Sequence, residues 1–391
     1  MNALLLESED VAWFRDDLTG ARLAASRLAR RIGLSEHRAG EIALAVSEAA
    51  SNLVKHAVAG AILLRVVRTA QHGGIEFLAL DSGPGMADVA ASMRDGRSTA
   101  GTLGIGLGMV ARLADTFDLH SLPGHGTVML ARFWPRDARL RPAVGGERSE
   151  SAVGGVTRPI GGAQECGDGW AARWDDAGTP VPGDALRDVT AAARIRASDR
   201  STPGYGGGPA AGPAAGRASA ALGAGRAVLV MLCDGLGHGP LAEMATQVAI
   251  RAFHTGAGGH PEEVVNEIHH ALASTRGAAV AVARIEPDQE RVLFCGVGNI
   301  AGAVVTSTSK SSLPSLPGTA GHLIRTLRTF THPMPTGSAL VMHSDGLTER
   351  WSPETLPGVL QHSPTVIAGH LLRIAGKYHD DASVVVAKGP W

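Results

Sequence analysis

Apolar residues in the first third of the chain follow two different periods. They recur every three or four residues at positions 42, 45, 46, 49 and 53, which predicts an amphipathic helix beginning after Ser35, a plausible N-cap, and ending near Val58. Further helices are expected at 21–32 and 107–115. Short apolar runs predict strands at 62–69, 75–81, 117–121 and 127–133. Residues 1–138 are therefore expected to form one α/β domain.

The second part of the chain, residues 156–391, is richer in predicted strands. These are expected at 170–174, 227–233, 278–285, 292–295, 302–306, 339–343 and 383–387. Helical spacing predicts helices at 240–255, 261–274 and 365–378. Residues 139–155 are polar, with Arg, Pro and Gly, and are expected to be a linker between two domains.

One insertion stands out by composition. Residues 201–225 are almost all Gly, Ala, Pro and Ser, within a segment of about 195–225. Such a segment cannot bury enough side chain to offset its ordering entropy, so mobility is the favoured interpretation. A catalytic lid is the alternative.

Composition narrows the function classes. A chain of 391 residues with 44% hydrophobic content has room for two or three cores, and its net charge of −1 gives no reason to expect nucleic acid or a membrane surface as a partner. No apolar run reaches the ~18 residues of a membrane span. Three cysteines are too few for a disulfide framework, so reduced thiols and a cytoplasmic location are expected.

The first candidate site combines a helix with two glycine-rich turns. Glu48 and Asn52 stack one turn apart on the polar shoulder of the helix, where a carboxylate and an amide suit a base and a Mg²⁺ ligand. Asp81 ends a strand and could accept a hydrogen bond from an adenine amino group. Two turns follow, and their glycines let a ligand approach the backbone: Gly83 and Gly85, then Gly104, Gly106 and Gly108 before a helix whose N-terminus suits phosphate. Glu48 and Asn52 alone would more often be a solvated helix face.

This ordered set, completed by Gly124-His125-Gly126-Thr127, resembles the GHKL (Bergerat) ATP-binding fold. The similarity is to the anti-sigma-factor serine kinases of the RsbW, SpoIIAB and RsbT type, over about residues 10–135. It implies ATP with Mg²⁺ as cofactor. The implied roles are general base for Glu48, Mg²⁺ ligand for Asn52, adenine contact for Asp81, phosphate loop for Gly104, Gly106 and Gly108, and proximity to the adenine base for Thr127. No phospho-acceptor histidine helix precedes the pocket, which disfavours a sensor histidine kinase.

The second candidate site consists of aspartates beside strands. Asp234, Asp345 and Asp380 each border an apolar run, and strand-end aspartates from distant sequence can converge. Oxygen-only ligands indicate Mg²⁺ or Mn²⁺. Two such ions about 3.5–4 Å apart could lower the pKa of a water and hold a phosphate. Any one of these aspartates alone is more often a turn residue or a helix cap.

Five motifs in order resemble the PPM-type protein phosphatases, closest to the SpoIIE and RsbX group. They are Glu165–Gly169, Asp234–Gly239, Gly296–Asn299, His343–Leu347 and Asp380–Ser383. The resemblance implies a β-sandwich flanked by helices and two Mn²⁺ or Mg²⁺ ions. Asp234 would bridge both metals, the Gly235 carbonyl would bind one, Asp345 and Asp380 would complete the pair, and Asp168 would be a partly water-mediated ligand. The segment between Asp168 and Asp234 is longer than this family's pattern.

Together the two resemblances imply a bifunctional partner-switching regulator. A serine/threonine kinase-like domain and a phosphoserine/phosphothreonine phosphatase would act on a STAS (anti-anti-sigma-like) protein. A sigma-regulatory complex and a homodimer are further candidate assemblies. In the alternative, the first domain only binds ATP or an anti-sigma partner, as a sensor; a phosphatase for a small phosphoester is a third option. Two opposed activities that were both unregulated would only consume ATP, so a signal must favour one activity over the other. Nucleotide occupancy and partner binding are the candidate signals.

Overall fold

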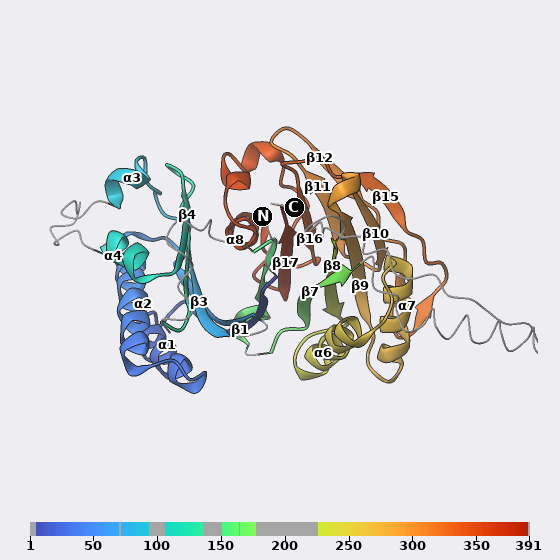
Figure 1. The fold of residues 1–391 in the computed structure, drawn as a ribbon, viewed down its shortest axis with the longest axis horizontal. Helices are drawn as coiled ribbons and strands as arrows, with labels where there is room; N and C mark the ends of the chain where they lie inside the picture. Colours follow the sequence, from blue (N-terminus) through green and yellow to red (C-terminus); the bar gives the residue numbers. More distant parts are fainter. Residues whose placement is uncertain are drawn as a thin grey trace, which may run out of the picture.

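The computed structural model describes residues 5–69, 72–93, 106–136, 151–163, 165–176 and 226–389. Gly104 and the glycine-rich insertion expected at about 195–225 lie outside these ranges. The described elements stack in layers, from helices α1, α2 and α4 through a first sheet, helix α8 and two further sheets to helices α6 and α7 (Figure 1). This layering confirms two α/β folds in one chain.

The first fold is a five-stranded antiparallel sheet in the order β1-β2-β3-β5-β4. Its strands are β1 (Glu7–Phe14), β2 (Ala61–Arg68), β3 (Gly73–Asp81), β4 (Thr116–Ser121) and β5 (Thr127–Phe133). Helices α1 (Gly20–Arg31), α2 (Glu36–His56) and α4 (Gly106–Leu113) pack on one face, and α3 (Val89–Ser92) is a single turn. The shared core consists of apolar side chains of α1, α2 and alternate strand positions.

The second fold is a sandwich of two five-stranded sheets. One has the order β15-β10-β9-β8-β7 and the other β12-β11-β16-β17-β6. The first contains β7 (Asp168–Asp176), β8 (Arg226–Gly235), β9 (Ala278–Glu286), β10 (Arg291–Val297) and β15 (Phe330–Pro333). The second contains β6 (Val153–Arg158), β11 (Ala301–Val305), β12 (Lys310–Leu313), β16 (Ala339–His343) and β17 (Ala382–Ala387).

Helices cover both outer faces of this sandwich. Helices α6 (Pro240–Thr255) and α7 (Pro261–Ala271) lie on the first sheet, and α8 (Pro364–Ala375) lies on the second. A small hairpin of β13 (Gly318–Thr319) and β14 (Leu323–Ile324) borders the first sheet. The prediction of a β-sandwich flanked by helices is confirmed.

Several predicted elements need correction. Strands β1, β6, β12 and β15 were not expected; β1 is a half-exposed, acidic edge strand, and β6 begins at Val153, inside the segment expected to be a linker. The helix expected at 365–378 ends at Ala375, because Gly376 takes an extended conformation and closes the last turn with its N–H to the Leu372 carbonyl (3.0 Å). Residues 376–378 therefore belong to a loop beside the candidate metal site.

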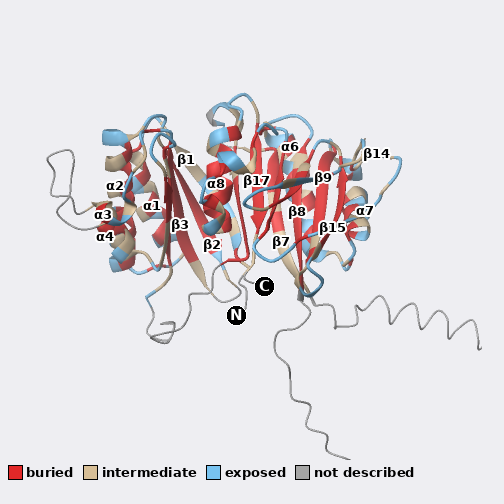
Figure 2. Ribbon diagram, turned by 90° about the horizontal axis from the view of Figure 1, so that it is seen from above, coloured by how far each residue is buried: buried red, intermediate tan, exposed pale blue. Residues whose placement is uncertain are grey.

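Helix α8 joins the two folds, because it is buried on nearly all sides. Leu78, Leu80 and Val128 of the first fold pack around Gly369, where an added Cβ would lie 3.1 Å from the tips of both leucines. The opposite side of α8 packs on β17 and β6 of the second fold. In Figure 2 the strands that face α8 from both sides are mostly buried. The two folds thus share one apolar core.

Buried polar contacts add to this junction. The Arg65 guanidinium, 1% exposed, pairs with Asp10 and Glu76 and donates to the Gly155 carbonyl of β6 (2.7 Å). Asp10 in turn accepts hydrogen bonds from the backbone N–H (2.8 Å) and hydroxyl (2.6 Å) of Thr157. Charged groups buried this deeply require such partners, so the junction has a defined geometry. In the part of the chain that is described, no helix is both long enough and apolar enough to span a bilayer.

Candidate nucleotide pocket and metal centre

The structure brings Glu48, Asn52 and Gly106 together. Glu48 and Asn52 project from α2 toward the first turn of α4, where a Cβ on Gly106 would lie 2.7 Å from Glu48 Oε2 and 3.8 Å from Asn52 Nδ2. A side chain at position 106 would therefore displace the Glu48 carboxylate. The N-terminus of α4, where the backbone N–H groups of the first turn lie, therefore borders a carboxylate and an amide. Gly108 is buried in the same helix.

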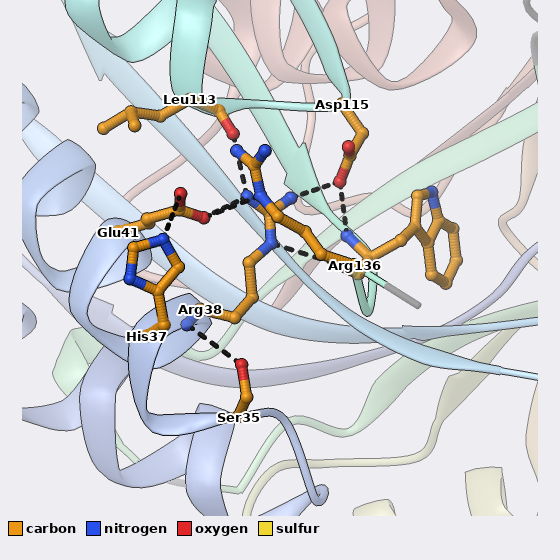
Figure 3. Close-up of polar contacts among 8 residues, drawn as sticks. Ser35, His37, Arg38, Glu41, Leu113, Asp115 and Arg136 are labelled. Atoms are coloured by element: carbon orange, nitrogen blue, oxygen red, sulfur yellow. Dashed lines mark hydrogen bonds and ion pairs between the residues drawn. The ribbon is translucent and has the colours of Figure 1, made fainter. Parts of the chain in front are cut away.

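Arg38 fixes the distance between α2 and α4. Its guanidinium is fully buried and donates to Glu41 Oε2 (2.7 Å), to the carbonyls of Leu113 and Trp134 (both 2.9 Å), and to Asp115 (Figure 3). Ser35 caps α2 by accepting from the Arg38 N–H (3.2 Å). One side chain thus ties the start of α2 to the end of α4, and so sets the walls between which Glu48 and Gly106 face each other.

Asp81 and Thr127 lie at the ends of β3 and β5 that the sequence assigned to adenine contact. The two residues are paired across the strands and lie on the helix-covered face of the sheet. Asp81 Oδ1 accepts from the Gly83 N–H (2.7 Å), and Thr127 Oγ1 lies 3.0 Å from the Ser121 hydroxyl. Burial raises the pKa of Asp81, while hydrogen bonds from Gly83 and Thr127 oppose that rise. A buried carboxylate in this position is a ready acceptor for an amino group.

Gly85 and Gly126 allow the turn after β3 and the turn before β5 to pack closely at this end of the sheet. Gly85 has φ +65° and lies against the Leu122 carbonyl, while Gly126 has φ +68° and lies against the Asp81 carbonyl. A side chain at either position would collide with those oxygens, at 2.0 Å from an added Cβ in both cases. Gly83 thus lies beside Asp81, and Gly106 beside Glu48 and Asn52, whereas Gly104 is outside the described residues.

In the second fold, Asp168 and Asp234 lie side by side at one end of the first sheet. They are directly paired between β7 and β8. Asp168 is buried and accepts a hydrogen bond from the Ser344 hydroxyl (2.5 Å), which links it to the second sheet. The Gly235 N–H donates to the Gly167 carbonyl (2.9 Å), holding the residue after Asp234 against the loop before Asp168.

Asp345 and Asp380 reach the same place from the second sheet. The Asn299 amide donates to Asp345 Oδ2 (2.7 Å) and lies 3.4 Å from Asp234 Oδ2, which brings these carboxylates together across the sandwich. Asp345 follows β16 and Asp380 precedes β17, two neighbouring antiparallel strands. The four predicted aspartates therefore converge at one end of the sandwich.

The crowding of carboxylates at this site raises their pKa values. Burial, together with the charges of Asp345 and Asp380, raises the pKa of Asp234 to about 7. Burial and the charge of Asp234 raise the pKa of Asp168 well above its ordinary value, and burial and Asp345 raise that of Asp380. Such like-charge crowding is unfavourable unless a cation balances it.

The donor set fits divalent cations with hydrated coordination shells. Within the described ranges, no group of three His, Cys, Asp or Glu side chains could hold a metal by itself. Mg²⁺ commonly keeps several waters and takes only one or two protein carboxylates, so a sparse all-oxygen set suits it. Asp234, Asp345 and Asp380 would hold the ions, with the Gly235 carbonyl and Asp168 in supporting positions.

Three residues that contact the aspartates were not assigned to this site from the sequence. Asn299 was noted only as part of a glycine loop, and Ser344 only as a neighbour of Asp345. Lys377, whose ammonium donates to the Asp345 carbonyl, was expected to lie in a helix. Asp381 Oδ1 and Oδ2 accept from the N–H groups of Ile160 (2.7 Å) and Gly167 (2.8 Å), so Asp381 tethers loops. No local pattern reveals these roles, because every partner lies more than thirty residues away in the chain.

Fold and sites together define a two-part protein, in which a GHKL-type ATP-binding fold precedes a PPM-type phosphatase fold. Residues 15–133 match the family model of the histidine kinase-like ATPase domain, and residues 224–390 match that of stage II sporulation protein E (SpoIIE). In its first part the chain belongs to the histidine kinase-like ATPase family, and its last part is similar to SpoIIE.

Two curated relatives come from Bacillus subtilis (strain 168). The serine/threonine-protein kinase RsbT is 38% identical over 120 residues, which are 31% of this chain and 90% of RsbT. The phosphoserine phosphatase RsbX is 28% identical over 123 residues, which are 31% of this chain and 61% of RsbX. This chain therefore spans less than two thirds of RsbX.

Solved structures are similar at a lower level. RsbX in complex with magnesium is 17% identical, with a TM-score of 0.43 over 62% of this chain and 96% of that one. The phosphatase domain of SpoIIE from Bacillus subtilis, with a fragment of its regulatory domain, is 14% identical, with a TM-score of 0.41 over 95% and 94%.

Proposed function

We propose that this protein is a bifunctional partner-switching regulator. Its second fold removes phosphate from a phosphoserine or phosphothreonine of a protein, and its first fold transfers phosphate from ATP to a serine or threonine. The observation that carries the proposal is the convergence of Asp168, Asp234, Asp345 and Asp380 at one end of the sandwich. When bound there, two divalent ions would activate a water and neutralise phosphoryl oxygens.

The chain's own residues contribute orientation and charge to the hydrolytic site. Asn299 holds Asp234 and Asp345 at a fixed separation, and Ser344 keeps Asp168 hydrogen-bonded to the second sheet. In the described residues around Asp234 the thiols are not nucleophiles, because burial raises the pKa of Cys166 and Cys233 and keeps them protonated. The arrangement supports direct attack by water, without a covalent enzyme intermediate.

In the first fold, Glu48 is positioned to act as a general base. Its carboxylate borders the N-terminus of α4, where the phosphates of ATP would lie, and could accept the proton of an attacking hydroxyl. Asn52 would hold Mg²⁺ with its amide oxygen, and Asp81 would accept the adenine amino group. The match to RsbT over 90% of that kinase supports retained catalysis. A binding module that senses ATP without phosphoryl transfer is the alternative.

The proposed protein substrate is a STAS-domain protein, given the similarity to RsbT and RsbX. One phosphate adds a charge of about −1.5 to −2 and three acceptor oxygens, which is enough to make or break a docking surface. Such a change explains why a chain would carry both opposed chemistries.

The test uses the full chain, because the two folds share a core. The intact protein is mixed with γ-labelled ATP and a candidate STAS protein, and with that protein already phosphorylated. We expect Glu48→Gln to abolish label transfer while nucleotide still binds, and Asp234→Asn to abolish phosphate release while label transfer persists. Nucleotide binding without any transfer would favour the sensor module. Phosphate release unaffected by Asp234→Asn would refute the assigned metal centre.

A further inference from the structure

Lys377 is held at the edge of the carboxylate site by contacts along its whole length. Its backbone N–H donates to the Gly346 carbonyl (2.7 Å), and its own carbonyl accepts from the Arg158 guanidinium. Its ammonium donates to the Asp345 carbonyl (2.5 Å). Lys377 follows α8 by two residues, so the shared helix and the turn that carries Asp345 together fix its position.

The Lys377 ammonium has hydrogen-bonding capacity beyond its contact with the Asp345 carbonyl. The residue is exposed, and an ammonium carries three donors, of which the Asp345 carbonyl occupies one. Donor capacity therefore remains on the solvent side of the site.

The charge balance of the site leaves a role for this lysine. Four carboxylates and two divalent cations sum to about zero, whereas a phosphorylated side chain brings about −1.5 to −2. A lysine is a compact point charge suited to a phosphate oxygen. Resting on the phosphatase function proposed above, we propose that Lys377 binds a phosphoryl oxygen of the substrate directly.

Lys377 could instead act only by supporting the Asp345 turn. The two roles differ in what they change: a phosphate ligand alters affinity for phosphate, while a support for Asp345 alters affinity for the metal. Lys388 provides a matched control, because its ammonium contacts the His362 carbonyl (3.2 Å) beyond the opposite end of β17 from Asp380. Replacing Lys388 makes the same change in net charge outside the site.

The experiment measures binding to the intact, folded protein by calorimetry, with Mg²⁺ alone and then with inorganic phosphate added to the Mg²⁺-loaded protein. We expect Lys377→Met to weaken phosphate binding about 10- to 100-fold, as for loss of a hydrogen bond to a charged group, and to leave Mg²⁺ affinity unchanged. Lys377→Arg should retain phosphate affinity within about threefold, and Lys388→Met should match the wild type. With phosphorylated protein as substrate, Lys377→Met should raise KM more than it lowers kcat.

The outcomes separate this inference from the function on which it rests. Unchanged phosphate affinity in Lys377→Met, or a loss of Mg²⁺ affinity that accounts for the whole effect, would overturn the role of Lys377 and leave the phosphatase standing. A wild-type protein that binds Mg²⁺ but shows neither phosphate binding nor phosphate release would overturn both.

Discussion

Replacing Leu78 with alanine tests whether the two folds unfold as one. Leu78 lies in β3 with its side chain fully buried against Gly369 of α8. Truncating a buried leucine to alanine costs about 2–5 kcal/mol, from lost burial and the cavity left behind. Since the affected contact belongs to both folds, the loss should destabilise both.

The size of the change in Tm distinguishes a shared core from two independent domains. Unfolding entropy is about 2.1 cal/mol/K per residue near 60 °C. For roughly 300 described residues melting together, a loss of 2–5 kcal/mol lowers Tm by about 3–8 °C. If the first fold, of roughly 130 residues, melted alone, its Tm would fall by about 7–18 °C and that of the second fold would stay constant.

Differential scanning calorimetry of the intact chain provides the measurement. We expect a single unfolding transition in the wild type. In Leu78→Ala the whole transition should move to lower temperature. Saturating nucleotide should move the whole transition to higher temperature, because a ligand at 100 times its Kd adds about 2.7 kcal/mol of stability. Leu44→Ala, at a side chain 45% exposed on α2, is the control and should stay within about 0.5 kcal/mol of wild type. Two transitions, of which only the first responds to Leu78→Ala or to nucleotide, would refute the shared core.

Three further predictions follow from buried polar groups. Arg38→Met should cost about 1–3 kcal/mol, because the Leu113 and Trp134 carbonyls lose their buried donor, and should weaken nucleotide binding; unchanged nucleotide affinity, measured where the variant is still folded, would show that α4 needs no such anchor. The pKa values of His120 and His370, lowered to about 4 and 3 chiefly by burial, mean that these side chains bind protons in the unfolded chain below about pH 6.5 but not in the fold, so each should cost up to ~1.4 kcal/mol of stability per pH unit as pH drops toward 4; the raised pKa values of Asp234 and Asp168 act in the opposite direction, so the check is the urea midpoint of His370→Gln against the wild type between pH 7 and 5, and an identical pH dependence would contradict this. Ser344→Ala removes the hydrogen bond that favours the charged form of Asp168, so calorimetry should show Mg²⁺ affinity reduced about 5- to 100-fold, and unchanged affinity would exclude Asp168 from the centre.

Sequence patterns were most informative where a local rule applies. The helical stripe beginning after Ser35 gave α2, because the cap and the spacing are properties of a single segment. Strands such as β8 and β9 were found because buried runs of Val, Leu and Ala leave few other options. Strands β1 and β12 were missed, since their half-exposed, polar sequences become strands only by pairing with a neighbour.

The residues of the candidate sites also differ in whether a local sequence pattern reveals them. The aspartates and glycines stood out because they recur in an ordered set of motifs, although each alone is a common turn residue. Asn299, Ser344 and Lys377 did not stand out, because their common residue types gain a role only from partners that the fold brings near.

By itself, the sequence determined that one chain carries two folds and singled out candidate side chains for phosphate chemistry, because periodicity, turn chemistry and the ordered motifs are local properties. Only the tertiary structure decided that the two folds are joined. The buried face of Leu78, Leu80 and Val128 looks like an ordinary core pattern in sequence, and its partner, Gly369, lies about 240 to 290 residues further along the chain. Burial against that partner is a property of the whole molecule, and it places the candidate nucleotide site and the candidate metal site on opposite sides of one helix.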